Sequence, residues 1–226
     1  MHKKITVACM AIAAFAIMPT TASAVQIGET SGGIFSALAV GSQITGTQNG
    51  NSRMTDKNGN ILVECSLGIM TGELTENGPT VIKGDITSAA FNTAGGAACP
   101  SFLSSTSVVT TKIEDAGHIQ TGVPWCLSTN KGTDTFEVRG GKCGEAARAL
   151  KFILDNSFAG ECEYSKASIG GTFATDFSGQ EAVATVDNTG AFGKIRGGVF
   201  CPTEGYLDMS FKLETDDGTG TPLYIK

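Results

Sequence analysis

The residues best suited to chemistry in this chain are its cysteines. Cys9 lies in an apolar N-terminal run, and six more follow: Cys65, Cys99, Cys126, Cys143, Cys162 and Cys201. A zinc site would need close C-x-x-C pairs or cysteines combined with histidines. The chain has no C-x-x-C, and His118 is the only histidine after His2. The even number of remaining cysteines therefore favours disulfide bonds, and we expect no metal and no other cofactor.

A degenerate repeat indicates which cysteines pair. Its copies share three dipeptides: Ala90-Phe91, Gly95-Gly96 and Cys99-Pro100 in the first, Ala191-Phe192, Gly197-Gly198 and Cys201-Pro202 in the second. Each copy ends a segment that begins with another cysteine. The repeat thus predicts Cys65–Cys99 and Cys162–Cys201, and leaves Cys126–Cys143. We expect one domain over 25–226, with repeat 1 at about 61–100, a linking hairpin region at 101–160 and repeat 2 at about 161–226.

Catalytic patterns are sparse. A serine triad needs a histidine base held by a carboxylate. The one candidate, His118, lies beside Glu114 and Asp115, and the chain has no G-x-S-x-G motif. Paired carboxylates can hydrolyse a glycosidic bond, but the acids here lie mostly beside turn residues, where solvated charge is usual. We therefore expect no enzymatic activity; the alternative is a secreted hydrolase acting on an extracellular polymer.

The N-terminus has the features of a secretory signal peptide. Lys3 and Lys4 are basic, Ile5–Met18 is apolar, and Ala22-Ser23-Ala24 is an A-x-A cleavage site. Removal of residues 1–24 takes away two lysines and no acid, which changes the formal net charge from −6 to −8. This acidic balance argues against nucleic acid as a partner. The apolar run is too short to span a bilayer and no later stretch is apolar enough, so we expect a secreted protein, extracellular or in the cell envelope, with no integral membrane segment.

The remaining sequence predicts an all-β fold with at most one short helix. Glycine supplies 30 of 226 residues, and short alternating runs are separated by Gly, Asn and Asp, as in an antiparallel β-sandwich or barrel. The clearest strand is Tyr206–Glu214, where apolar and polar residues alternate. Asn58-Gly59 indicates a hairpin turn, and Gly198–Cys201 is expected to be a strand. For Gly144–Asn156 we expect a turn or short helix followed by a strand.

The strongest apolar stripes are candidates to line a ligand cavity. An eight-stranded barrel can enclose one small ligand, and the candidate lining residues are Trp125, Phe173, Phe177, Leu207, Met209, Phe211 and Leu213. Trp125 has two interpretations: an exposed aromatic near the mouth of the cavity, or a side chain packed on a disulfide in the core, which is favoured. The alternative for the whole set is that these side chains simply fill the core.

The order of short motifs resembles a known group of proteins. The series runs through Cys65, Ile86–Phe91 before Cys99, Val123-Pro124-Trp125, Cys162-Glu163-Tyr164, Gly170–Phe173, Cys201-Pro202 and Pro222–Ile225. It resembles small exported bacterial β-rich proteins of unknown function and, more distantly, the PraB family of secreted alkane-oxidation activators. The resemblance implies a secreted β protein with a non-enzymatic role, and it implies no catalytic residues.

These features predict a secreted, non-enzymatic module that interacts with a protein, a surface or a small hydrophobic molecule. A further possibility is a structural subunit that polymerises by strand addition through an exposed sheet edge. Val25–Ile34 and Thr221–Lys226 are the segments expected to supply such an edge.

Overall fold

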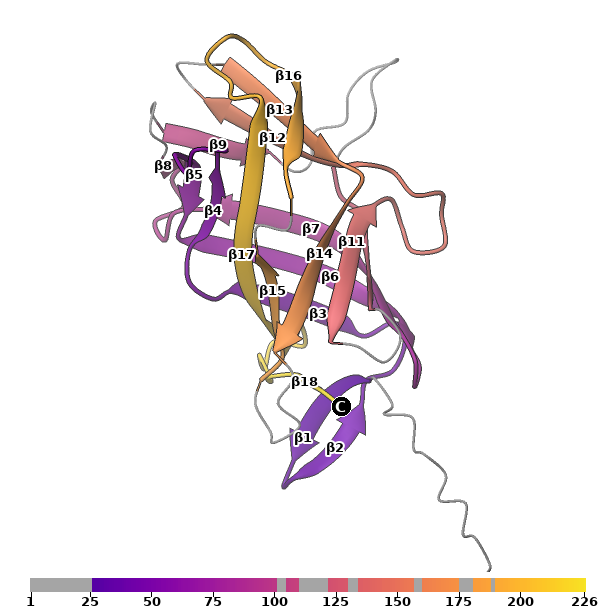
Figure 1. The fold of residues 1–226 in the computed structure, drawn as a ribbon. Coiled ribbons are helices and arrows are strands. Elements are labelled where there is room, and N and C mark those ends of the chain that lie inside the picture. The colour runs from indigo at the N-terminus through magenta and orange to yellow at the C-terminus, as the bar shows by residue number, and fades with distance from the viewer. Residues whose placement is uncertain are drawn as a thin grey trace, which may run out of the picture.

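The computed structural model describes residues 26–100, 105–109, 122–129, 134–156, 160–174, 181–187 and 190–226. Within these ranges every regular element is a strand, and there is no helix (Figure 1). The strands are β1 (Ile27–Ser31), β2 (Ile34–Ala37), β3 (Gln43–Gln48), β4 (Ser52–Thr55), β5 (Ile61–Cys65), β6 (Leu67–Asn77), β7 (Ile82–Asn92), β8 (Cys99–Pro100), β9 (Ser105–Val109), β10 (Trp125–Thr129), β11 (Thr135–Gly140), β12 (Leu150–Asn156), β13 (Gly160–Lys166), β14 (Ser168–Ala174), β15 (Val183–Asp187), β16 (Phe192–Arg196), β17 (Glu204–Thr215) and β18 (Tyr224–Ile225). The expected all-β class is confirmed. The predicted signal peptide, residues 1–24, lies outside the described residues.

Eight antiparallel strands close into a barrel. Their order is β15-β14-β11-β10-β7-β6-β3-β17, and β17 pairs again with β15. The registers show the closure directly, because Phe211 of β17 lies opposite Gln48 of β3 on one side and Ala184 of β15 on the other. The alternation predicted for Tyr206–Glu214 places one face of β17 inside this barrel, with Met209 and Phe211 buried.

The strand β17 is longer than the barrel and carries a second group of strands at the upper end of Figure 1. Its first residues, from Glu204 to Asp208, pair with β16 and with β4. From β16 the ladder continues to β13, β12, β9 and β8, and from β4 it continues to β5. The Cys65–Cys99 disulfide joins β5 to β8. A covalent bond therefore connects the two ends of this group, which we call the upper strands.

A small sheet of β18, β1 and β2 lies at the lower end of the barrel (Figure 1). In this lower sheet β1 pairs with β18 on one side and with β2 on the other. Of the two alternative segments for an exposed edge, Val25–Ile34 contains β1, which is the middle strand, whereas Thr221–Lys226 contains β18, which lies at an edge. The edges of the lower sheet are β2 and β18.

Aromatic contacts join the barrel interior to the upper strands. Trp125 of β10 packs on Phe152 of β12, with ring centroids 5.5 Å apart, and Phe152 meets the edge of Phe192 at 5.3 Å. Phe91 and Phe211 form another edge-to-face pair, with centroids 6.2 Å apart. These side chains belong to one continuous hydrophobic cluster, so the barrel and the upper strands share a core.

The three expected disulfides are present: Cys65–Cys99, Cys126–Cys143 and Cys162–Cys201. In both predicted repeats, the strand that carries the first cysteine is followed after a single residue by a hairpin, β6–β7 or β14–β15. Phe91 and Phe192, the aromatic residues of the two copies, are both buried. The two segments nevertheless pair with different neighbours, and the repeat stays a prediction.

The segment Gly144–Asn156 contains no helix. Its start is a turn, in which the Glu145 N–H donates to the Lys142 carbonyl at 3.1 Å. An extended bridge follows, because the backbone N–H groups of Gly140 and Arg148 donate to each other's carbonyls at 2.9 and 3.0 Å. The strand β12 comes next, with Leu150, Phe152 and Leu154 buried. The predicted turn and strand are thus confirmed, and the alternative of a short helix is wrong.

Gly198–Cys201 is a turn, so the expectation of a strand there is wrong. The Cys201 N–H donates to the Gly198 carbonyl at 3.1 Å. The Lys194 ammonium also donates to the carbonyls of Cys201, at 2.9 Å, and Gly198, at 3.4 Å. These bonds use the carbonyls within the loop, and the strand of this region, β16, ends at Arg196.

Replacing Cys65 and Cys99 with alanine tests how far the upper strands depend on their covalent link. The chain-entropy model gives about 4 kcal/mol for closing this 34-residue separation and about 3 kcal/mol for the 17 residues between Cys126 and Cys143. We expect the larger loss of unfolding free energy in urea for Cys65→Ala/Cys99→Ala, with Cys126→Ala/Cys143→Ala as the matched control. An equal or smaller loss would contradict the closing role of the bond.

Candidate functional site

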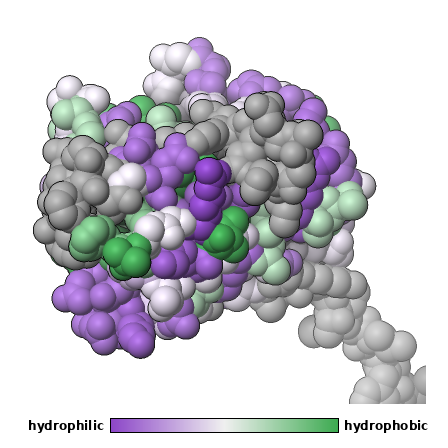
Figure 2. Space-filling view, turned by 90° about the horizontal axis from the view of Figure 1, so that it is seen from above, coloured by the Kyte–Doolittle hydropathy of each residue, from purple (hydrophilic) through white to green (hydrophobic). Residues whose placement is uncertain are grey.

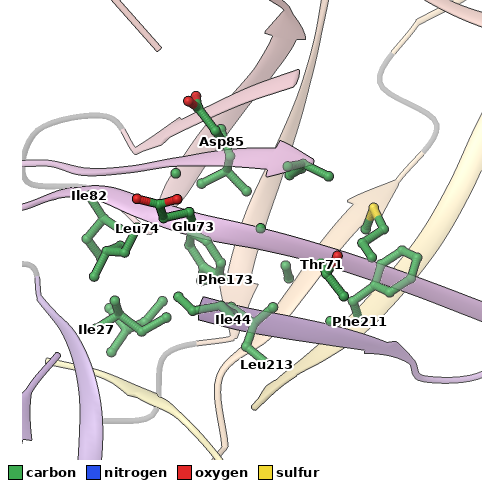
Figure 3. Close-up of a pocket in the computed structure, with 18 residues that line it drawn as sticks. Ile27, Ile44, Thr71, Glu73, Leu74, Ile82, Asp85, Phe173, Phe211 and Leu213 are labelled. Atoms are coloured by element: carbon green, nitrogen blue, oxygen red, sulfur yellow. The ribbon is translucent and has the colours of Figure 1, made fainter. Parts of the chain in front are cut away.

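Apolar side chains enclose a cavity at the lower end of the barrel (Figure 3). It offers about 100 Å³ to the centre of a water-sized molecule, and its wall is almost entirely carbon. The labelled apolar side chains that line it include Ile44, Leu74, Ile82, Phe173 and Phe211 from the barrel and Ile27 from the lower sheet. We call this space the barrel cavity.

Glycines on the inner face of the barrel create this space. Gly46, Gly72 and Gly84 come from three adjacent strands and all line the cavity. A Cβ at Gly46 would face Phe211 and Leu213 at ordinary contact distances of 3.5 and 3.6 Å, whereas a Cβ at Gly84 would lie 3.3 Å from the Glu73 carbonyl oxygen, a tight contact with the neighbouring strand. A Cβ at Gly72 would lie closer still, 2.6 Å from the Asp85 carbonyl oxygen. The cavity therefore occupies volume that a larger residue at Gly46 would fill.

A second, smaller apolar cavity adjoins the first. It offers about 40 Å³ and lies toward the upper strands, where Trp125, Phe152 and Met209 help to line it. Five residues line both spaces: Met70, Ile86, Leu127, Ala184 and Phe211. The two cavities are thus adjacent, and the longer shared side chains, such as Met70 and Phe211, can change rotamer without breaking the barrel ladder.

The structure brings together most of the candidate ligand residues. Phe173 and Leu213 line the barrel cavity, Trp125 and Met209 line the second cavity, and Phe211 lines both. Leu207 lies higher, against a small gap between the barrel and the upper strands. Phe177 falls outside the described residues.

Trp125 is buried, so the interpretation as an exposed aromatic at the cavity mouth is wrong. Its relative exposure is 2%, and its ring packs on Phe152. Other lining residues could not be singled out from their sequence pattern. Ile27 and Ile225 enter the barrel cavity from the lower sheet, and the glycines contribute by lacking side chains.

Asn77, at the end of β6, holds the lower sheet against the barrel. Its side-chain amide donates to the carbonyls of Ile27 and Leu38, both at 2.8 Å, and its side-chain oxygen accepts the Ile27 N–H at 2.9 Å. One side chain therefore bonds to backbone on both β1 and the segment that follows β2. This attachment fixes Ile27 as the floor of the barrel cavity.

Acidic groups border the barrel cavity without pointing into it. Asp85 lies opposite Glu73 in the β6–β7 ladder, and Glu73 is exposed. The Asp85 carboxylate points away from the apolar lining (Figure 3) and accepts a hydrogen bond from the Cys143 N–H at 2.6 Å. Asp85 also lies beside the sulfurs of Cys126 and Cys143, but these are joined in a disulfide and are not free to ligate a metal as thiolates.

An open polar groove lies where β4, β15 and β17 meet. It offers about 400 Å³, and Asn51, Arg53, Asp187 and Asp208 help to line it. Asp187 and Asp208 are directly opposed in the β15–β17 ladder, and Asp208 also lies opposite Arg53 in the β4–β17 ladder. Two carboxylates therefore share this groove with one cation.

Exposed apolar residues gather at both ends of the molecule. At the upper end Val199 and Phe200 are 91% and 54% exposed in the loop before β17. Figure 2 looks down on this end and shows hydrophobic patches among hydrophilic residues. At the lower end Ile34, on β2, is 75% exposed, and Val40 follows it along the chain. Such residues mark surfaces that can bind a partner.

Comparisons with protein-family models, with curated proteins and with solved structures find no match to this chain. No helix capable of crossing a membrane occurs in the part of the chain that the structure describes. The class of the protein therefore comes from its own fold and site. It is a disulfide-bonded antiparallel β-barrel with an apolar interior cavity.

Several buried side-chain polar atoms have no hydrogen-bond partner among the described residues, and two of them belong to aromatic residues of the shared core. They are the indole Nε1 of Trp125 and the hydroxyl of Tyr164. Burial raises the pKa of Tyr164 to about 12, and the negative charge of Asp56 is the second cause. Both effects disfavour the phenolate, so the native state retains this proton.

Alkaline unfolding of a Tyr164→Phe variant tests this environment. An unfolded tyrosine titrates near pH ~10, below the native pKa, so the stability that Tyr164 contributes is complete below pH ~10 and is lost as the pH rises towards about 12. We expect urea unfolding to show a steeper loss of stability over this range in the natural protein than in Tyr164→Phe. At neutral pH the variant should be at least as stable, because it removes an unpaired hydroxyl. Identical pH profiles would contradict the burial.

Proposed function

We propose that this protein is an exported, non-enzymatic binding module whose barrel holds a small apolar molecule. The observation that carries the proposal is the barrel cavity, with its carbon-lined wall and its volume of about 100 Å³. A space that would be part of an ordinary core is kept open by Gly46. Filling it with an apolar ligand would recover dispersion contacts that the surrounding side chains lack.

The size and chemistry of the cavity limit the ligand. About 10–15 Å³ of such volume suffices for one water molecule, yet apolar cavities of on the order of 150 Å³ stay dry and bind benzene or xenon. Water is not stable in such a cavity, because the wall offers almost no hydrogen-bonding groups. The barrel cavity therefore fits a compact hydrocarbon group of a few carbons, and a longer chain would need the shared side chains, including Phe211, to move and open the second cavity.

We also propose that the protein is exported and that it does not catalyse a reaction in its barrel cavity. Three disulfides agree with a protein that folds outside the reducing cytosol, and the N-terminal sequence has the features of a signal peptide. Among the described residues that line the barrel cavity, no carboxylate is directed inward, which favours binding over chemistry there. The resemblance to exported proteins linked with alkane use also supports an apolar ligand.

Ligand titration of a cavity-filled variant tests this function. We expect benzene or a short alkane to raise the melting temperature of the natural protein by mass action and to change the fluorescence of Trp125, which lines the adjoining cavity. Gly46→Leu places a side chain where the ligand would lie, so both responses should be lost. Gly46→Ala, whose Cβ fits at 3.5 Å from its nearest neighbour, should weaken them only in part.

The matched control is Thr47→Leu, which adds a similar side chain on the opposite face of β3. It should leave the ligand response unchanged. No saturable response in the natural protein, or equal responses in Gly46→Leu and Thr47→Leu, would show that the cavity is only a packing defect of the core.

The polar groove favours a second candidate function, hydrolysis of an extracellular polymer. Opposed carboxylates such as Asp187 and Asp208 are the groups that glycoside hydrolysis uses, and the groove is open to a chain-like substrate. Arg53 lines the same groove, where it lies opposite Asp208 in the β4–β17 ladder and forms an ion pair with Glu64 at 3.7 Å.

A hydrolase screen with polysaccharide substrates separates the two functions. We expect no turnover by the natural protein, and therefore no difference on changing Asp187→Asn or Asp208→Asn. Turnover that either substitution abolishes, while the melting temperature is retained, would replace the binding proposal with the hydrolase.

A further inference from the structure

The outer edge of β2 is an unpaired sheet edge. The strand follows β1 through a tight turn at Gly32 and Gly33, which both have positive φ, 58° and 81°. Among the described residues β2 pairs with β1 alone. In Figure 1 this hairpin extends below the barrel, with β2 at its border.

The register identifies the backbone groups that this edge offers. Ile34 lies opposite Ser31, Ser36 lies opposite Glu29, and the Leu38 N–H donates to the Ile27 carbonyl at 3.0 Å. Residues 34, 36 and 38 therefore direct their N–H and C=O groups toward β1, because hydrogen-bonded positions alternate along an antiparallel strand. The N–H and C=O groups of Phe35 and Ala37 point outward.

Among the described residues, none of the usual protections covers this edge. Proteins block edge strands with lysines, prolines, bulges or inward-pointing charges, and β2 reads Ile-Phe-Ser-Ala with a regular ladder to β1. Ile34 is 75% exposed and Ser36 and Ala37 are also exposed. The strand is thus uncharged, and no other described strand pairs with its outer edge.

We propose that β2 pairs with β2 of a second copy of this chain. A two-fold axis perpendicular to the sheet would place Ser36 opposite the partner's Ser36. Phe35 would then exchange both backbone hydrogen bonds with the partner's Ala37, and Ala37 with the partner's Phe35. The result is a continuous sheet of six strands, β18-β1-β2 followed by the same three in reverse, across two barrels.

Self-complementarity is what selects a second copy as the occupant. In this register Ile34 meets the partner's Leu38 and Phe35 meets the partner's Ala37, so apolar residues face each other and no like charges are opposed. Cross-strand pairs of this kind stabilise a sheet. The contact is short, because β2 has four residues, so the dimer forms reversibly and depends on concentration.

Substitutions that introduce a charge at Ser36, on the proposed symmetry axis, test this pairing. Sedimentation velocity of the mature chain, from micromolar to millimolar concentration, should show a monomer–dimer equilibrium. Ser36→Asp places two carboxylates face to face, with Glu29 on the neighbouring strand adding to the repulsion, and should abolish the dimer. An equal mixture of Ser36→Asp and Ser36→Lys should restore dimers, because opposite charges then meet.

Two controls keep the result specific to the β2 edge. Ser36→Ala preserves an uncharged edge and should dimerise as the natural protein does. Ser31→Asp puts the same charge on the same hairpin but on β1, away from the axis, and should also dimerise. A natural protein that stays monomeric throughout, a Ser36→Asp variant that dimerises normally, or a mixture that fails to restore dimers would overturn the proposal.

Discussion

The fold depends on β17, a single strand that belongs to two groups of strands at once. Its later residues pair with β3 and β15 and close the barrel, while its earlier residues pair with β4 and β16 and carry the upper strands. Asp208 illustrates the double pairing, since it is opposed by Arg53 on one side and Asp187 on the other. Without β17 the barrel would have two open edges and the upper strands would lose their connection to it. Burial of alternate residues from Leu207 to Phe211 fixes the strand in this register.

The barrel interior combines large aromatic side chains with glycines, which have no side chain to fill space. Where a glycine faces an aromatic ring closely, the ring fills the space: a Cβ at Gly171 would collide with the ring of Phe136. At Gly46 a Cβ would fit at 3.5 Å from its nearest neighbour, so space remains beside it. The β6–β7 ladder contains two register shifts beside the cavity, and such bulges bend a strand away from its neighbours. Two features therefore produce the cavity. One is the presence of glycines on the inner face of β3, β6 and β7, and the other is the irregular ladder between β6 and β7.

Sequence reasoning succeeded where the relevant interactions are local. The alternation in Tyr206–Glu214 and the turn at Asn58-Gly59 predicted β17 and the β4–β5 hairpin, because strand periodicity and turn chemistry involve neighbouring residues. The disulfides were predicted in another way, because the degenerate repeat indicated which cysteines pair although they lie 17 to 39 residues apart. Burial of Trp125 was the favoured interpretation. Closure of the barrel and the position of β1 between β2 and β18 depend on residues far apart in the chain, which no local pattern encodes. The inner glycines were missed for the same reason, since a pattern of residue types does not say which strand will lie opposite a missing side chain.

Because β17 comes after the other barrel strands in the sequence, the barrel can close only late in folding. Contacts between residues far apart in sequence form slowly, because the entropy of closing long loops is lost before the contacts form. One edge of β3 and one edge of β15 stay unpaired until β17 is added. In the same way, β1 can pair with β18 only when nearly the whole described chain is available. An N-terminal portion of the chain would expose open ladders and could not complete its core. Closure of the barrel and of the lower sheet therefore requires nearly the whole described chain.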